Sequence, residues 1–264
     1  MTENKPSLKE VQDFWNARPC NLRHSNSPVG TKQYFDEVEE RKYFVEPHIP
    51  AFADFPNWAG KRVLEIGCGI GTDATNFSRN GAIYTGVELS SESLKLAKQR
   101  FDVFGLSGRF IEGNAEEIDQ LLKGETFDLI YSFGVLHHTP NLEMALKAIR
   151  TLMEPSSVFK MMVYAKNSWK SAMIAAGLDQ PEAQNGCPIA NTYTHSEVSD
   201  ILDLSGFVVT NLSQNHIFPY KVDEYKNYNY VREPWFQVMP EGVFAAMEKQ
   251  LGWHLMITSA LKRV

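Results

Sequence analysis

The feature that most constrains the fold is a short apolar run that ends in three glycines at alternate positions. It reads Arg62-Val-Leu-Glu-Ile-Gly67-Cys-Gly69-Ile-Gly71, and a helix-like pattern follows from about Asp73 to Arg79. The pattern predicts a buried strand, a tight turn and a helix N-terminus. Glycine lets the backbone turn sharply and lets a ligand approach without meeting a Cβ atom, and the first helical turn offers free N–H groups. The stretch therefore predicts a ligand site at this turn.

Two classes of ligand use such a turn: dinucleotides, and ligands that carry a cationic amino group. The glycines alone do not separate these classes. Dinucleotides favour the spellings G-x-G-x-x-G and G-x-G-x-x-A, and Gly69-Ile-Gly71-Thr-Asp-Ala74 fits the second. Glu65, however, stands two residues before the first glycine. A carboxylate there suits the cationic amino group of a methionine tail, whereas it would repel a pyrophosphate. A glycine turn without a ligand is the third alternative.

Strand-like and helix-like segments alternate after this turn. Besides the first strand, we expect strands at residues 82–88, 109–113, 127–133, 158–164, 207–212 and 253–260. Strands that alternate with helices imply an α/β fold with a doubly wound, mostly parallel sheet. Residues 165–193 and 216–240 interrupt the alternation and are expected to be insertions. Before the first strand, residues 8–58 predict a helix, a loop and a helix, rich in aromatic side chains that would also serve to seal the edge of the sheet.

Composition narrows the class of protein. The chain has 264 residues, of which 43% are hydrophobic, which suits one α/β domain with additions and a sizeable core. A net charge of -6 argues against a general nucleic-acid binder. The three cysteines, Cys20, Cys68 and Cys187, are widely spaced and form neither a metal-type pair nor a disulfide framework. We therefore expect no metal site, and a reducing compartment.

The ends and apolar runs of the chain bear on location. The first residues lack the apolar core of a signal peptide, and no run approaches the roughly 20 apolar residues of a membrane span. We therefore expect a cytoplasmic protein with no membrane partner and no nucleic-acid partner. The oligomeric state is left open.

Two motifs carry a family resemblance. The spelling E-x-G-x-G-x-G, from Glu65 to Gly71, resembles the first motif of class I S-adenosylmethionine-dependent methyltransferases. Tyr131-Ser-Phe-Gly-Val-Leu-His-His-Thr-Pro140 is similar to the segment after the fourth strand of small-molecule methyltransferases. The motifs cover about residues 60–215, and beyond them the resemblance rests on the order of elements. It implies a seven-stranded, Rossmann-like sheet with an antiparallel last strand, and S-adenosylmethionine as cofactor.

The resemblance also divides the chain and assigns cofactor residues. It implies a helical lid at residues 1–58 over a catalytic domain at 59–264. Glu65 and the three glycines, Gly67, Gly69 and Gly71, would hold the methionine end of the cofactor. The other cofactor residues fall near the ends of later strands: Glu88, Leu89, Asn114, Ala115, Ser132 and Phe133.

The residues near the ends of the later strands would contact different parts of the cofactor. Glu88 ends the second expected strand, where a carboxylate can accept from both hydroxyls of a ribose, a device that NAD enzymes share. In the resembled family, Leu89 would pack on the adenine. Asn114 and Ala115 stand where that family usually has Asp-Ala at the adenine. The amide is a departure from the pattern, and Asn114 fits a helix cap as well. The backbone of residues 132–133 would lie along the methionine part.

His137 is the candidate catalytic residue. The resemblance implies that it faces the acceptor, and an imidazole can take a proton from a hydroxyl, an amine or a carboxyl group. A residue that only shapes the pocket is the alternative, and we expect His138 to pack or to cap the next helix. Aromatic side chains suit an acceptor wall that excludes water. The candidates, each of which would fit the core equally well, are Trp15, Tyr34, Tyr43, Tyr164 and Trp169.

The leading hypothesis is methyl transfer from S-adenosylmethionine to an oxygen or nitrogen of a small-molecule acceptor, with a natural product or a peptide among the options. Two alternatives remain open. An NAD(P)-dependent oxidoreductase would need a second half-fold for the nicotinamide, of which the sequence gives no sign. A protein that binds S-adenosylmethionine without turnover would carry the same motifs. Methylation of DNA-base amino groups is not expected, because the chain lacks an Asn/Asp-Pro-Pro-Tyr/Phe stretch.

Overall fold

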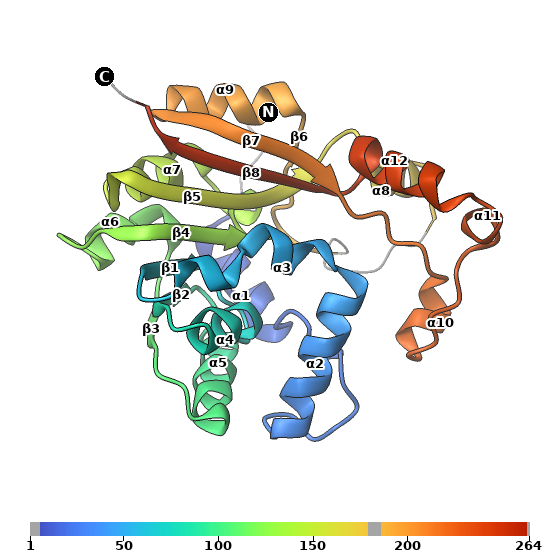
Figure 1. Ribbon diagram of the computed structural model, residues 1–264, viewed down its shortest axis with the longest axis horizontal. Coiled ribbons are helices and arrows are strands. Elements are labelled where there is room, and N and C mark those ends of the chain that lie inside the picture. Colours follow the sequence, from blue (N-terminus) through green and yellow to red (C-terminus); the bar gives the residue numbers. More distant parts are fainter. Residues whose placement is uncertain (1–5, 179–185, 263–264) are drawn as a thin grey trace.

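A mixed β-sheet forms the centre of the protein. The computed structural model describes residues 6–178 and 186–262. The strands follow the order β3-β2-β1-β4-β5-β8-β7, with a short β6 beside β5 (Figure 1). Their bounds are β1 Arg62–Ile66, β2 Ile83–Glu88, β3 Arg109–Glu112, β4 Phe127–Phe133, β5 Met153–Ala165, β6 Thr192–Tyr193, β7 Phe207–Asn215 and β8 His254–Leu261. Pairs within the sheet are parallel except those of β8, which runs antiparallel to β5 and β7. The predicted sheet with its antiparallel last strand is confirmed, and the two-residue β6 is an addition.

Helices cover both faces of the sheet. On one face, α6, α7 and α9 pack against Leu64, Ile130 and Phe159 in the largest apolar cluster. On the other face, α4, α5 and the 3-10 helix η1 pack against Tyr84 and Tyr131. The bounds of these helices are α4 Thr72–Arg79, α5 Ser91–Phe104, α6 Ile118–Leu121, α7 Leu142–Arg150, α9 His195–Leu204 and η1 Phe55–Trp58. The cap residues agree with the sequence: Asn141 caps α7, and Thr194 opens α9 with a capping box.

The N-terminal segment has two parts. Helix α1 (Leu8–Ala17) lies near α5 and contributes Leu8, Val11 and Trp15 to a cavity. Helices α2 (Lys32–Val45) and α3 (His48–Ala53) bury apolar side chains in the body of the protein, with Tyr34 and Phe35 fully enclosed. The part that could act as a lid is therefore α1, and the division of the chain at residue 58 stays a prediction.

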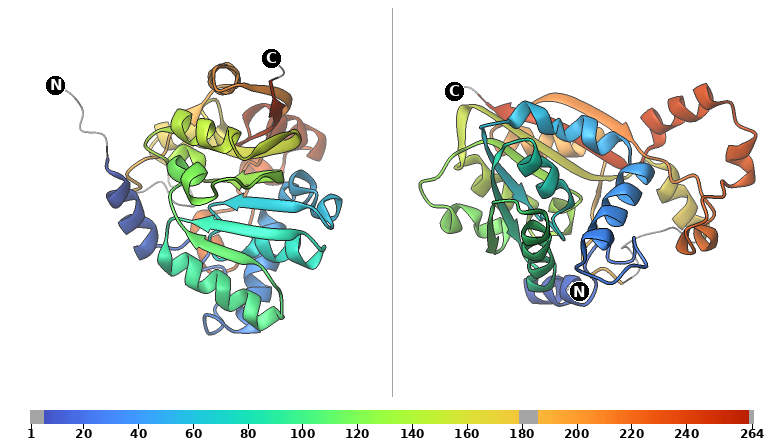
Figure 2. Two further views of the ribbon diagram at one scale, coloured as in Figure 1. Left: turned by 90° about the vertical axis from the view of Figure 1, so that its left-hand side faces the viewer. Right: turned by 60° about the horizontal axis from the view of Figure 1, so that its bottom comes forward.

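Both expected insertions contain short helices. Residues 165–193 hold α8 (Trp169–Ala175) and β6, and residues 179–185 lie outside the described part. Residues 216–240 hold α10 (Val222–Lys226) and α11 (Pro234–Gln237), which extend from the sheet together with α12 (Glu241–Leu251) in both Figure 1 and Figure 2. Within the described ranges, no helix has the length and apolar character that a membrane span requires.

Candidate functional site

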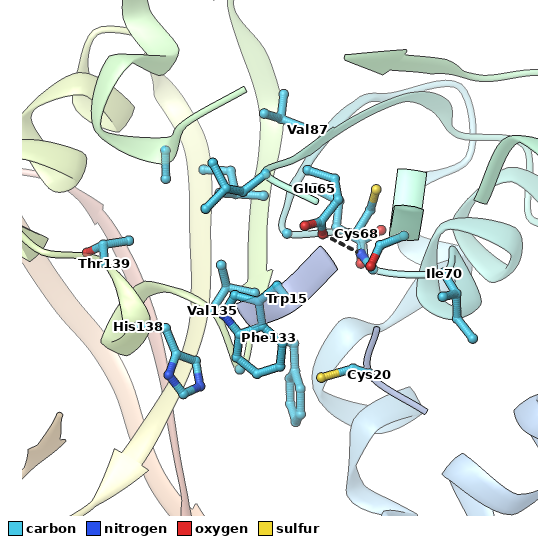
Figure 3. A pocket seen from close by; sticks show the side chains of 18 of the residues that line it. Trp15, Cys20, Glu65, Cys68, Ile70, Val87, Phe133, Val135, His138 and Thr139 are labelled. Carbon is cyan, nitrogen blue, oxygen red and sulfur yellow. Dashed lines mark hydrogen bonds between the residues drawn. The ribbon is translucent and has the colours of Figure 1, made fainter. Parts of the chain in front are cut away.

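A cavity opens at the carboxyl ends of the central strands, which is where open α/β sheets bind ligands. It measures about 1050 Å³ including its mouth. Its walls are the glycine turn after β1, the residues that follow β2, β3 and β4, and one side of α1 (Figure 3). Eight of the ten predicted cofactor residues line it: Glu65, Gly67, Gly69, Glu88, Leu89, Asn114, Ala115 and Phe133.

The glycine turn needs glycine at each of its three positions. Gly67, Gly69 and Gly71 have φ angles of 75°, 54° and 80°, in the left-handed region that side chains disfavour. A Cβ atom at Gly67 would overlap Val135, whereas at Gly69 it would point into open space beside the cavity. The turn therefore lets a ligand approach the bare backbone at Gly69.

Glu88 is held in place by backbone donors. Its Oε2 atom accepts from the N–H of Gly69, and its Oε1 atom accepts from the N–H of Ser90, both at 2.8 Å. Burial raises the pKa of Glu88, and these backbone hydrogen bonds oppose the rise. The remaining lone pairs of this fixed carboxylate can accept from a vicinal diol such as a ribose.

Leu89, Asn114 and Ala115 form the wall next to Glu88. The Oδ1 atom of Asn114 accepts from the N–H of Glu116 at 3.1 Å and caps the 3-10 helix η2 (Ala115–Glu117). Asn114 therefore caps a helix and lines the cavity at the same time, as the sequence allowed.

Two further acidic side chains, Glu65 and Asp73, line the same cavity. Glu65 accepts from the hydroxyl of Tyr84 at 2.6 Å. Asp73 accepts from the ammonium of Lys42 at 2.6 Å and from the hydroxyls of Tyr43 and Tyr131 at 2.9 and 3.0 Å. Burial, together with the charge of Asp73, raises the pKa of Glu65 to about 8. Two carboxyl groups, of which Glu65 is mainly protonated near neutral pH, and one ammonium therefore line this part of the cavity.

Asp73 and Lys42 were missed as site residues by the sequence analysis. Asp73 follows the last glycine by two residues, so its place in the first turn of α4 was a usable signal. Lys42 comes from α2, and its approach depends on how that helix packs on the sheet. No local pattern marks it.

Two predicted cofactor residues lie outside the cavity wall. Gly71 caps α4, and a Cβ atom there would come within 3.2 Å of Ala97. The hydroxyl of Ser132 donates to the carbonyl oxygen of Ile66 at 3.1 Å and ties β4 to β1. Both residues support the site from behind.

Of the five acceptor-wall candidates, Trp15 lines the cavity and the other four do not. Tyr34 is fully buried and donates to the carbonyl oxygen of Leu22. The hydroxyl of Tyr43 binds Asp73, and Tyr164 stacks on Trp253 in the core. Trp169 packs on Phe236 in the region of the second insertion. The buried Tyr34 and Tyr164 correspond to the core alternative that the sequence left open, whereas Tyr43 and Trp169 are half-buried.

His137 and His138 occupy different environments within the 3-10 helix η3 (Leu136–His138). His137 is fully buried between His138 and Tyr164, with ring centroids 4.0 and 3.8 Å away, and it lies outside the cavity wall. His138 lines the cavity beside Trp15, and its Nδ1 atom is hydrogen-bonded to the carbonyl oxygen of Ile189. Both the expectation that His137 faces the acceptor and its catalytic role stay predictions.

Comparison with known proteins identifies the family. The profile of the methyltransferase-domain family matches residues 38–212. A probable phthiotriol/phenolphthiotriol dimycocerosates methyltransferase 2 from Mycobacterium ulcerans is 31% identical over 131 residues, 46% of this chain and 48% of the relative. A ubiquinone biosynthesis O-methyltransferase from Haemophilus ducreyi is 29% identical over 102 residues, 38% of this chain and 43% of the relative. The chain thus spans about half the length, or somewhat less, of these curated relatives.

Solved structures share the fold. The magnesium protoporphyrin IX methyltransferase of Synechocystis PCC 6803, with bound S-adenosylhomocysteine, superposes with a TM-score of 0.64 and 14% identity. The match covers 97% of this chain and 100% of that protein. Because the family profile also spans more than half of the chain, the protein belongs to the class I S-adenosylmethionine-dependent methyltransferases.

Proposed function

We propose that the protein transfers the methyl group of S-adenosylmethionine to an oxygen or nitrogen of a small molecule. One observation carries the proposal: the carboxylate of Glu88, which can accept from a diol, lines the same cavity as Glu65, Asp73 and Lys42, which suit a zwitterion, and the glycine turn forms part of its wall. S-adenosylmethionine carries both groups: a methionine zwitterion at one end and, between it and the adenine, a ribose diol. A dinucleotide would bring a pyrophosphate to carboxylates that repel it.

Each end of the cofactor then has named partners. Glu88 accepts from the ribose hydroxyls, and Leu89 and Ala115 cover the adenine. Glu65 accepts from the ligand ammonium, which Asp73 also attracts, while Lys42 donates to the ligand carboxylate. When bound, the cofactor supplies an electrophilic methyl group on a sulfonium, and the chain has to align the acceptor and exclude water. Val11 and Trp15 of α1 and Phe133 at the end of β4 supply an apolar wall for that purpose.

Oxygen is the acceptor atom that we favour. The relative from Haemophilus ducreyi is named an O-methyltransferase, and a hydroxyl acceptor has to lose a proton. We propose that His138, which lines the cavity, receives it: because Nδ1 is next to the Ile189 carbonyl, we assign the hydrogen to that nitrogen, and Nε2 then keeps its lone pair. The Nε2 atom is buried without a hydrogen-bond partner. Burial lowers the pKa of His138 to about 4, which keeps the imidazole neutral before the reaction.

Two experiments test the proposal in sequence. Mass spectrometry of nucleotide released from the denatured protein, with calorimetry, should show binding of S-adenosylhomocysteine and none of NAD. A screen with methyl-labelled cofactor should then transfer label to phenols or other hydroxyl acceptors, with amines and carboxylic acids as the other arms. Tight NAD binding without a response to S-adenosylhomocysteine would overturn the cofactor assignment. Cofactor binding without transfer in any arm would instead favour the binding protein without turnover.

A further inference from the structure

Three histidines and a glutamate form a compact group beside Phe133, a residue that also lines the cavity. We call Glu46, His48, His216 and His254 the histidine cluster. They come from separate elements: Glu46 ends α2, His48 begins α3, His216 follows β7, and His254 begins β8. His254 is 2% exposed, and Glu46 and His216 are each 9% exposed. So many polar side chains in a nearly enclosed place require an explanation, because burying polar groups is costly.

The donor atoms of the cluster have the spacing of a metal site. One ligand atom each from Glu46, His216 and His254 lie within 4.8 Å of one another. The Nε2 atom of His254 is 3.4 Å from an Oε1 atom of Glu46. Ligands that bind one ion at about 2.0–2.2 Å sit roughly 3–4 Å apart, so a small side-chain rotation closes the set. Two imidazoles and one carboxylate with further open positions are typical of catalytic zinc and of non-haem iron(II).

His48 supplies the support that metal-binding histidines usually have. Its Nε2 atom is 2.9 Å from the Nδ1 atom of His254, which leaves the Nε2 atom of His254 pointed at Glu46. A hydrogen bond to the second ring nitrogen of a ligand histidine fixes its tautomer and orientation. The Nδ1 atom of His48 is itself buried with no hydrogen-bond partner.

Backbone strain marks the same place. His216 has a φ angle of 75°, in the left-handed region that residues other than glycine seldom adopt. Two hydrogen bonds hold it: its carbonyl oxygen accepts from the N–H of Trp253 at 2.8 Å, and its N–H donates to the Oδ1 atom of Asn215 at 2.7 Å. The result is a His216 ring stacked on that of His254, with centroids 4.6 Å apart. Backbone strain that the surrounding structure maintains is found most often at functional sites.

We propose that Glu46, His216 and His254 bind a divalent transition-metal ion, zinc or iron(II), and that His48 orients His254. The site adjoins the cavity, since Phe133 lines the cavity and its ring centroid is 5.3 Å from that of His254. The sequence predicts no metal, because these ligands are far apart along the chain. The proposal stands independently of methyl transfer, and ion binding is measurable without turnover.

Metal analysis of the wild-type protein is the first test. After treatment with a chelator, the protein is titrated by calorimetry with zinc, with iron(II) under anaerobic conditions, and with magnesium. We expect about one equivalent of zinc or iron to bind, and magnesium to bind weakly because it prefers all-oxygen ligands. A visible absorption spectrum of the cobalt(II)-loaded wild type should show histidine and carboxylate ligation. Absence of stoichiometric binding, or a cobalt spectrum equal to that of the hydrated ion, would overturn the proposal and leave a hydrogen-bonded network.

Matched variants locate the ion. Glu46→Gln and His254→Gln should weaken zinc or iron binding by more than about 100-fold, since even residues that only hydrogen-bond a ligand contribute about 10–100-fold. His48→Gln should weaken zinc or iron binding by about 10–100-fold. His195→Gln is the control, because His195 is an exposed histidine outside the cluster, and its affinity should equal that of the wild type. Circular dichroism and S-adenosylhomocysteine binding check the fold of each variant. Unchanged affinity in a folded His254→Gln variant, or loss in His195→Gln, would assign the ion elsewhere.

Discussion

The carboxylate of Glu88 accepts a hydrogen bond from the backbone N–H of Gly69 at 2.8 Å, which joins the end of β2 to the turn after β1. The two neighbouring strands therefore present one preformed surface before any ligand arrives. The hydrogen bond orients the carboxylate of Glu88. Because Gly69 has no side chain, a ligand can also approach the turn at this point. With the second hydrogen bond, from the N–H of Ser90, both oxygens of the Glu88 carboxylate are held by the backbone.

Glu88→Gln should weaken S-adenosylhomocysteine binding by about 10–100-fold. The backbone N–H groups of Gly69 and Ser90 each need an acceptor, and an amide offers only one oxygen, so one N–H would face an NH₂ group. A hydrogen bond to a charged group contributes about 1.5–3 kcal/mol. Calorimetry measures the change. Glu92→Gln, an exposed glutamate in the next helix, is the control and should bind like the wild type.

Lys42→Met should reduce both stability and affinity. The ammonium of Lys42 pairs with Asp73, which is 2% exposed, and removing one partner of a buried pair costs about 3–5 kcal/mol. Because the hydroxyls of Tyr43 and Tyr131 still donate to Asp73, we expect the lower end of that range in denaturant unfolding.

The same variant tests which part of the ligand Lys42 binds. If Lys42 binds the carboxylate of the methionine tail, Lys42→Met loses affinity for S-adenosylhomocysteine but keeps its affinity for 5′-methylthioadenosine, which lacks that tail. Equal losses for both ligands would show that Lys42 acts through the fold alone.

Cofactor affinity should rise with pH up to about pH 8. In the free protein, burial and the charge of Asp73 raise the pKa of Glu65 to about 8. A ligand ammonium favours the ionised carboxylate, so the pKa of Glu65 falls on binding and a proton is released. Below pH 8, affinity should therefore decrease by up to about tenfold per pH unit, and above it the gain should end.

Calorimetry from about pH 6 to about pH 9 checks this dependence on Glu65. Glu65→Gln should bind S-adenosylhomocysteine more weakly and lose the slope below pH 8. Binding of 5′-methylthioadenosine, which has no ammonium, serves as the control and should vary little with pH. A wild-type affinity that stays constant across this range would remove Glu65 as the partner of the amino group.

Deleting residues 1–17 should lower activity far more than thermal stability. Helix α1 touches the body through few polar contacts, among them Gln12 to the Leu89 carbonyl oxygen at 2.9 Å and the Ser90 hydroxyl to the Trp15 carbonyl oxygen at 3.3 Å. Its side chains nevertheless form one wall of the cavity. Thermal unfolding and a methyl-transfer assay give the two readouts, with Trp15→Ala as the smaller change. An insoluble or molten truncated chain would make α1 part of the core.

Local patterns predicted the glycine turn and several of the residues that line the cavity. The strand, the glycine turn and the start of α4 are encoded within about a dozen neighbouring residues, and the φ angles of the three glycines confirm why glycine stands there. Glu88 and Asn114 were found because strand ends in a parallel sheet share one edge.

Side chains that reach the site by packing of distant elements escaped prediction. Lys42 meets Asp73 because α2 lies on the body of the protein, and the histidine cluster gathers residues from both ends of the chain. The choice between His137 and His138 is difficult for a different reason. In a 3-10 turn, adjacent side chains point about a third of a turn apart, so a motif names the pair without saying which member faces the cavity.

His138→Ala should reduce methyl transfer to a hydroxyl acceptor by about 10²–10⁴-fold while cofactor affinity stays nearly unchanged. The reason is geometric: His138 lines the cavity with its Nε2 atom unpartnered, whereas His137 is enclosed behind it. His137→Gln should therefore retain most activity and the wild-type pH–rate profile if the variant folds. Burial lowers the pKa of His138 to about 4, so the acidic limb of the wild-type profile should lie near that value and disappear in His138→Ala. The measurement is turnover against pH for both variants, with S-adenosylhomocysteine affinity as the check on the site. Loss of turnover and of the acidic limb in folded His137→Gln, with His138→Ala nearly normal, would restore His137 as the base.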